Sequence, residues 1–357
     1  MTKLTYNTNR KKGAALCSRL GMRVLLVGLS LATGLVRLGA TEYIYGIGTD
    51  WNLYQISING STVTSTAKLN LSGYVSGFGT HNNDYLNGLG IDQSTGDIYF
   101  NYSYNNNSSS TSGTMTVVPY IYQNVNGSYR APYALGSAIT SATLTATDVG
   151  AGWLPRGTYY NGAYYLGQQL SDTMVVLPIT GSSTKSYSSV TAYSNWDHTS
   201  VTSLNGGDFV IGTNNVIYGT AGISNANQFY RQQLTAATNS AGAAWTIFNV
   251  DASIPIATQG SIQVAGLGQS TNLYVISSTG KNLYQVNGYD GASAPTFTQI
   301  GSNGVIPVTM TDLSIVVTAP LPVPETSTVV GGAAAAIGVG WEAFRRIRRQ
   351  RNSKRTV

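Results

Sequence analysis

The sequence predicts an all-β fold, a β-propeller of about five blades. One observation is an internal repeat, because the pentapeptide Asn-Leu-Tyr-Gln-Ile at Asn52 returns as Asn-Leu-Tyr-Gln-Val at Asn282. A second observation is a set of tyrosines that each follow a turn and an apolar residue: Tyr99, Tyr165, Tyr218 and Tyr274. They lie 66, 53 and 56 positions apart, and Tyr45 lies 54 positions before Tyr99. Helical patterning is nearly absent. Periods near 50, with short strands between Gly, Asn and Ser turns, are typical of propellers.

The ends of the central region, residues 41–318, indicate how a propeller ring would close. Met310 to Ile315 has the pattern of the first strand of a blade whose later strands are missing. Glu42 to Gly46 has the pattern of a second strand whose first strand is missing. Joined, the two segments would make one blade shared by the termini. We therefore predict five units, the shared one and four others that begin near Leu86, Thr147, Leu204 and Ile262.

Other all-β architectures compete with this prediction. The stretch from Asn101 to Ser141 is long enough to hold extra strands, so six blades are an alternative. An antiparallel sandwich and a β-solenoid would also use short strands and frequent turns. In each of these folds the Asn, Ser and Thr run from Asn105 to Ser112 is expected to form a flexible surface loop.

The amino-terminal segment has the layout of a secretory signal. Arg23 precedes a mostly apolar run of 13 residues, Val24 to Val36, and the small residue Ala40 offers a cleavage point. We therefore predict that residues 1–40 are a signal peptide and that the rest is exported. The single cysteine, Cys17, would leave with the signal, so the mature body could form no disulfide.

The carboxyl-terminal segment has the layout of a sorting signal. A short motif in residues 319–328, with Val323, Pro324, Glu325 and Thr326 at its centre, precedes a weakly apolar run, residues 329–344. Basic stop-transfer residues follow in the predicted cytoplasmic tail, 345–357: Arg345, Arg346, Arg348, Arg349 and Arg351. A permanent span needs about 20 apolar residues. The 16-residue run favours a transient, processed transmembrane segment, with a lasting anchor as the alternative.

This order of motif, apolar run and basic cluster resembles the PEP-CTERM sorting domain of Gram-negative bacteria. The family usually reads Val-Pro-Glu-Pro, and here Thr326 stands at the second proline. The resemblance covers Pro322 to Arg355. It implies a partner, a membrane sorting protease of the exosortase class, and an association with the cell envelope or with exopolysaccharide.

The charge of the predicted body excludes one class of partner. Residues 41–318 carry six basic and twelve acidic side chains, a net charge of −6, although the whole chain has a net charge of +6. Nucleic-acid binding requires a basic surface that neutralises phosphates. We therefore predict that the body does not bind nucleic acid.

Motifs for catalysis, cofactors or metals are scarce in the body. It contains no nucleophile elbow and no phosphate-binding glycine loop, and neither His81 nor His198 has a second histidine at ligand spacing. Aspartates recur near the unit starts, where turn formation explains them best: Asp92, Asp97, Asp148, Asp208 and Asp312. We therefore predict no cofactor, no metal and no enzymatic activity.

Tryptophans in or near probable turns are the remaining candidates for function. They are Trp51, Trp153, Trp196 and Trp245. Aromatic faces suit sugar rings, although they equally suit packing between blades. The sequence therefore favours a non-enzymatic surface or matrix protein, a binding or structural module whose ligand is exopolysaccharide or another surface protein, with Trp153 and Trp196 as candidate ligand-binding residues. The alternative is an extracellular glycan lyase or hydrolase that uses Asp197 and His198 with Asp148 or Asp208.

Overall fold

The computed structural model describes most of the predicted body. The described residues are 41–105, 115–140, 156–167, 174–193, 208–223, 226–234, 246–249, 262–266, 268, 270–277, 281–318 and 320–321. The predicted signal, sorting motif, transmembrane segment and basic tail lie outside these residues. So does all of the predicted 105–112 loop except Asn105.

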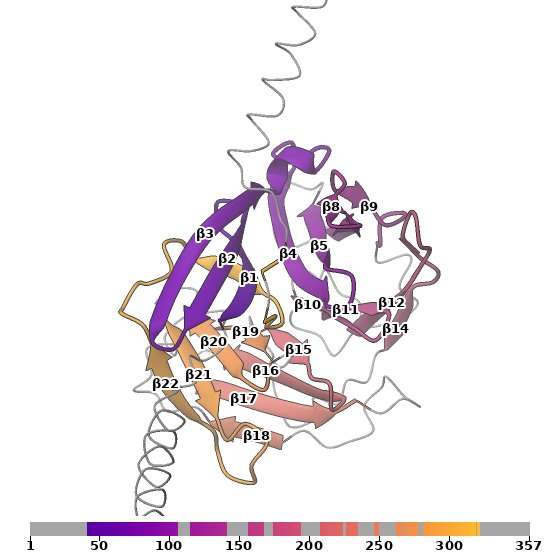
Figure 1. The fold of residues 1–357 in the computed structure, drawn as a ribbon. Helices are drawn as coiled ribbons and strands as arrows, with labels where there is room; N and C mark the ends of the chain where they lie inside the picture. Colours follow the sequence, from indigo (N-terminus) through magenta and orange to yellow (C-terminus); the bar gives the residue numbers. More distant parts are fainter. Residues whose placement is uncertain are drawn as a thin grey trace, which may run out of the picture. The chain divides into compact units, whose positions relative to one another are not determined.

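Five antiparallel sheets follow one another along the chain as the blades of a propeller (Figure 1). Blade 1 consists of β23 (Met310–Leu313), β1 (Glu42–Gly48), β2 (Asn52–Asn59) and β3 (Thr62–Asn70). Blade 2 consists of β4 (Asn82–Asp92), β5 (Asp97–Asn105), β6 (Met115–Tyr122) and β9 (Tyr133–Ala134). Blade 3 consists of β10 (Arg156–Tyr160), β11 (Ala163–Gly167) and β12 (Met174–Thr180), and β12 pairs with both β13 (Ser186–Tyr187) and β14 (Thr191–Tyr193).

The last two blades complete the arrangement. Blade 4 consists of β15 (Phe209–Ile211), β16 (Val216–Ile223), β17 (Ala226–Gln233) and β18 (Thr246–Asn249). Blade 5 consists of β19 (Ile262–Gly266), β20 (Leu273–Ser277), β21 (Leu283–Asn287) and β22 (Thr296–Ile300). The five-blade prediction is therefore confirmed. The extra strands suspected after Asn101 are a small hairpin, β7 (Asn124–Val125) with β8 (Ser128–Tyr129), and no sixth blade occurs among the described residues.

The first strands of the blades surround the centre of the arrangement. Contacts run from β4 to β10, to β15, to β19, to β23 and back to β4. The recurring tyrosines all lie one strand further out, on β1, β5, β11, β16 and β20, and all are buried. The sequence period of these tyrosines is therefore the period of the blades.

Second strands are buried on both faces because they stand between two neighbouring blades. Successive side chains of a strand point to opposite faces. Tyr164 of β11 accordingly packs with Tyr99 toward blade 2, whereas Tyr165 packs with Phe209 toward blade 4. This explains why these strands read as continuous apolar and aromatic runs rather than as an alternating pattern. Among the described residues there is no α-helix, and the one helical turn is a 3₁₀ segment, Ser72–Tyr74.

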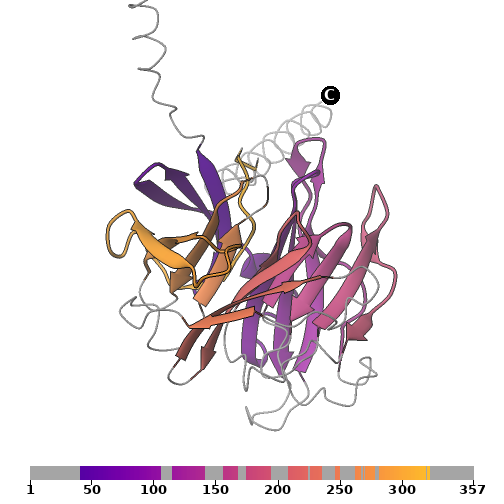
Figure 2. The same ribbon diagram turned by 90° about the horizontal axis from the view of Figure 1, so that it is seen from below.

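Blade 1 takes strands from both ends of the described body. β23 pairs antiparallel with β1, with Gly46 opposite Leu313 and Gly48 opposite Met310. Backbone hydrogen bonds between Tyr43 and Val317 extend the pairing beyond β23. The two segments lie side by side in both ribbon views, at the indigo and yellow ends of the colour scale (Figures 1 and 2).

Candidate functional site

The turn between β1 and β2 holds Trp51 in an unusual backbone conformation. Its φ is 64°, in the left-handed region that glycine and asparagine normally occupy. The Trp51 N–H donates to the Gly48 carbonyl (2.8 Å), and the Asp50 carboxylate accepts hydrogen bonds from the side chains of Asn52 (2.8 Å) and Tyr54 (2.7 Å). A bulky residue in this conformation costs about 1–2 kcal/mol. The strain makes Trp51 a candidate for a role beyond the turn.

The internal repeat shows that this turn does not need a tryptophan. Lys281 precedes Asn282 in blade 5 just as Trp51 precedes Asn52 in blade 1, and its φ is 51°. Both turns therefore place a non-glycine residue in the left-handed region before the repeated pentapeptide. Because lysine serves in one of them, the indole ring of Trp51 is not a requirement of the turn.

Trp51 belongs to a group of aromatic rings at one rim of blades 1 and 2. The loop between β3 and β4 brings Phe78 and His81 to it, turning at Gly77 and Gly79, whose φ values are 82° and 79°. Strands β4 and β5 supply the other rings. We call this group the aromatic rim cluster, and its members are Trp51, Phe78, His81, Tyr85, Tyr102 and Tyr104.

The rings of the aromatic rim cluster form a continuous series of contacts. Trp51 meets Phe78 and Tyr85 edge to face, with ring centroids 5.4 and 6.3 Å apart. Phe78 lies 5.8 Å from Tyr102, and Tyr102 stacks on Tyr104 at 5.0 Å. The ring of His81 stacks on Tyr104 at 4.0 Å. All members except the buried Tyr102 are half-buried, so part of this aromatic surface faces solvent.

Hydrogen bonds among Asp84, Tyr102 and His81 fix the polar side of the cluster. Asp84 Oδ2 accepts the N–H groups of Gly79 (2.6 Å) and His81 (3.3 Å), which holds the loop in place. Asp84 Oδ1 accepts the Tyr102 hydroxyl (2.5 Å), and the Tyr102 oxygen lies 2.9 Å from His81 Nδ1. Burial, this hydrogen bond and the charge of Asp84 all raise the pKa of Tyr102, so its hydroxyl keeps its proton.

The cluster can bind ligands that combine an apolar face with hydroxyl groups. Half-buried aromatic rings offer stacking surfaces, and the histidine and tyrosine edges offer hydrogen-bonding groups. Sugar rings present both features.

The centre of the propeller holds a buried carboxyl pair rather than an open site. Asp312 of β23 and Asp208, just before β15, are hydrogen-bonded to each other and are 0% and 1% exposed. Asp312 Oδ2 accepts the Leu89 N–H (2.9 Å), so the turn explanation for Asp312 is wrong. Burial, and secondly the neighbouring Asp208, raise the pKa of Asp312 well above its usual value. Arg156 of β10 lies close enough to interact electrostatically with Asp208.

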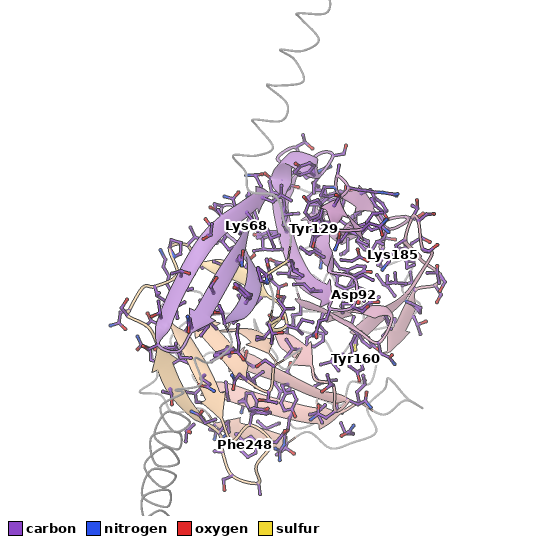
Figure 3. The ribbon with its side chains drawn as sticks, in the orientation of Figure 1. Lys68, Asp92, Tyr129, Tyr160, Lys185 and Phe248 are labelled. Atoms are coloured by element: carbon purple, nitrogen blue, oxygen red, sulfur yellow. The ribbon has the colours of Figure 1, made fainter. Side chains whose placement is uncertain are left out.

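A second charged network joins blades 2 and 3. Lys185, between β12 and β13, forms ion pairs with Asp97 and with Asp92 (3.6 Å), and Figure 3 labels Lys185 and Asp92 side by side. Burial acts to raise the pKa of Asp92, but hydrogen bonds from Ser94 and the charge of Lys185 outweigh it and lower the pKa. The Lys185 side chain is only 12% exposed. This network therefore ties the two blades together.

The structure describes only part of the residues that the sequence singled out. Trp51 lies in a turn, as expected, whereas Trp153, Trp196 and Trp245 lie outside the described residues. The proposed catalytic group Asp197, His198 and Asp148 lies outside them too, and Asp208 is buried in the carboxyl pair. Sequence reasoning missed the role of His81, for which the only signal was its place between glycines and an aspartate.

Two features are absent from the part of the chain that the structure describes. No group of three or more His, Cys, Asp or Glu side chains there could hold a metal ion. None of its helices is long and apolar enough to span a membrane.

Comparison with solved structures finds distant similarity. A protein from Bacteroides uniformis, described as a "putative 6-phosphogluconolactonase", is 11% identical over 75% of this chain and 70% of its own, with a TM-score of 0.36. A protein from Lactobacillus plantarum is 10% identical over 73% of this chain and 66% of its own, with a TM-score of 0.30. Comparisons with family models and with curated proteins find no match.

Proposed function

We propose that this chain is an exported, non-enzymatic binding protein of the cell surface or extracellular matrix, and that its aromatic rim cluster binds polysaccharide. The observation that carries the proposal is Trp51, held at a strained φ of 64° where the equivalent turn of blade 5 has Lys281. Residues held in strained backbone conformations cluster at ligand-binding and active sites. The half-buried rings of the cluster beside Trp51 supply the stacking surface.

The position of the cluster relative to the chain ends supports this proposal. Glu42 begins β1 beside Val317, and the Leu321 N–H donates to the Tyr45 hydroxyl (2.7 Å), so both described ends lie at one rim. Trp51 follows the opposite end of β1, roughly 20 Å away at about 3.3 Å per residue. The cluster therefore lies at the rim opposite the described chain ends, so an attachment of the mature protein near those ends would not cover it.

Replacing Trp51 should weaken polysaccharide binding by about 1–3 kcal/mol, by analogy with aromatic residues that stack on nucleic-acid bases. Trp51→Lys is the matched variant, because Lys281 already adopts this backbone conformation in blade 5. Binding can be measured by affinity electrophoresis against a polysaccharide panel, with thermal melting as the control for folding. The same measurement on Trp153→Ala and Trp196→Ala tests the two sequence candidates. Unchanged binding by Trp51→Lys would contradict the proposed site.

The enzymatic alternative has its own control. A double variant, Asp197→Ala with His198→Ala, should keep polysaccharide retention. Glycan turnover that disappears in this variant would overturn the non-enzymatic proposal.

Processing of the carboxyl terminus tests the sorting part of the proposal. A sorting protease of the exosortase class would have to recognise the motif from Val323 to Thr326. Replacing Pro324 and Glu325 with alanine should therefore leave an unprocessed, membrane-retained form. Mass spectrometry of the surface protein can detect peptides beyond Arg345, which the wild-type mature protein should lack. Normal processing of the double variant would remove the sorting role of the motif.

A further inference from the structure

The hydrogen bonds of Tyr102 determine which nitrogen of His81 carries a proton. The Tyr102 hydroxyl has one hydrogen, and two of its neighbours can only accept: the Asp84 carboxylate at 2.5 Å and the Gly77 carbonyl at 3.2 Å. That hydrogen therefore points toward these acceptors, and chiefly toward the closer Asp84. The Tyr102 oxygen must then accept at its 2.9 Å contact with His81 Nδ1. Nδ1 of His81 is therefore the protonated nitrogen of the neutral ring.

Nε2 of His81 is consequently left with an open lone pair. Within the described residues no side chain or backbone group hydrogen-bonds this nitrogen, and the side chain is 27% exposed. Stacking on Tyr104 and the bond to Tyr102 hold the ring in one orientation. The arrangement leaves a fixed hydrogen-bond acceptor next to an aromatic surface.

Two acidic side chains are bonded into this part of the rim, and one basic residue, Lys68 of β3, lies two positions before Asn70, which pairs with Asn52 at the start of β2. Asp84 anchors the loop that carries His81, and Asp50, which is exposed, anchors the turn that carries Trp51. The predicted body has a net charge of −6. A polyanion, such as a uronate-rich or sulfated polysaccharide, would meet like charges at this surface. A neutral sugar would meet no such repulsion, and its hydroxyl groups can donate hydrogen bonds to the lone pair of His81 Nε2.

We propose that the aromatic rim cluster selects neutral, hexose-based polysaccharide, with Nε2 of His81 accepting a hydrogen bond from a sugar hydroxyl while the solvent-facing part of a half-buried ring of the cluster stacks on the sugar face. This inference rests on the proposed function and names the ligand class of the same site.

The test compares neutral polysaccharides with charged derivatives of the same backbones. Suitable probes are dextran, pullulan, laminarin and galactomannan, each beside its carboxymethylated form, in affinity electrophoresis at fixed ionic strength. We expect at least one neutral probe to bind, and carboxymethylation to weaken binding at least tenfold. His81→Ala should weaken the neutral interaction about fivefold or more. Gln299→Ala, an exposed polar change on blade 5, should leave it unchanged.

The outcomes separate this inference from the proposed function. Binding that depends on Trp51 but is as tight for the carboxymethylated probes, or is unaffected by His81→Ala, overturns the ligand class and leaves the proposed function standing. Failure of every probe to bind, or binding that is insensitive to Trp51→Lys, overturns the proposed function itself.

The tautomer of His81 can be tested without any ligand. The chain has two histidines, so ¹⁵N NMR of a His198→Ala protein reports on His81 alone. We expect the Nδ1–H tautomer at pH 8, because the Tyr102 oxygen (2.9 Å) and the Asp84 carboxylate (3.5 Å) both face Nδ1 as acceptors. A ring protonated on Nε2 in the parent protein would overturn the inference, since no acceptor would remain.

Discussion

Deleting Met310 to Ile315 should abolish cooperative thermal unfolding of the propeller. The deleted segment supplies β23, which pairs with β1 and contacts the first strands of blades 2 and 5. Met310, Leu313 and Ile315 are 1%, 0% and 4% exposed, and burying each such side chain contributes about 1.5–3 kcal/mol. Their combined contribution approaches the whole stability of a typical domain, about 5–15 kcal/mol. The deletion would also leave β1 as an unpaired edge.

Scanning calorimetry or circular dichroism can follow this melt. The control is a deletion of Gly291 to Ala294, an exposed stretch between β21 and β22, which should keep a cooperative transition. A sharp transition in the β23 deletion, close to that of the wild type, would mean that the five blades hold together without the shared sheet.

Replacing Asp312 with alanine or with asparagine should change stability in different ways. Alanine removes the acceptor of the Leu89 N–H and the partner of Asp208, and each buried polar group left unpaired costs about 1–3 kcal/mol. Asparagine can still accept from Leu89 and can donate its amide hydrogens to Asp208. We therefore expect Asp312→Ala to be clearly destabilised, whereas Asp312→Asn keeps the contacts of the protonated acid.

The dependence of stability on pH provides the sharper readout for Asp312. Its folded pKa is raised, so the folded chain keeps a proton that the unfolded chain releases. The stability from this group is therefore full below the unfolded pKa, about 3.9, and is lost as pH rises through the folded pKa. Urea unfolding from pH 4 to pH 8 should show this decline in the wild type, a flatter profile in Asp312→Asn, and a more stable Asp312→Asn at neutral pH. An Asp312→Asn protein with the wild-type slope would contradict the raised pKa of Asp312.

The sequence predicted the blade architecture because its signals are local and repeated. Each recurring tyrosine follows a turn, and the unit starts near Leu86 and Ile262 fall within β4 and at the start of β19. The starts near Thr147 and Leu204 lie outside the described residues, a few positions before β10 and β15. Periodicity of this kind arises because each strand pairs with the next one along the chain. Short sequence segments are enough to specify such pairing.

The aromatic rim cluster and the carboxyl pair at the centre of the propeller could not be predicted, because they depend on contacts between distant segments. Asp208 and Asp312 are 104 positions apart and meet only because β15 and β23 both reach the centre. His81 meets Tyr102 and Tyr104 because the loop turns at Gly77 and Gly79 before β4 begins. The turn at Trp51 was predicted, but its left-handed backbone was not, since the sequence has no glycine or asparagine there.

The shared blade also affects how this chain can be made. β23 is the last strand among the described residues, and Tyr43 bonds to Val317 across 274 positions. During synthesis β1 therefore keeps an open edge until almost the whole body has left the ribosome. Contacts of such long sequence separation also slow folding, because a long loop must close before they form. A chain that completes its first blade last stays unfolded for longer. Only an unfolded chain can pass through a narrow protein-conducting channel.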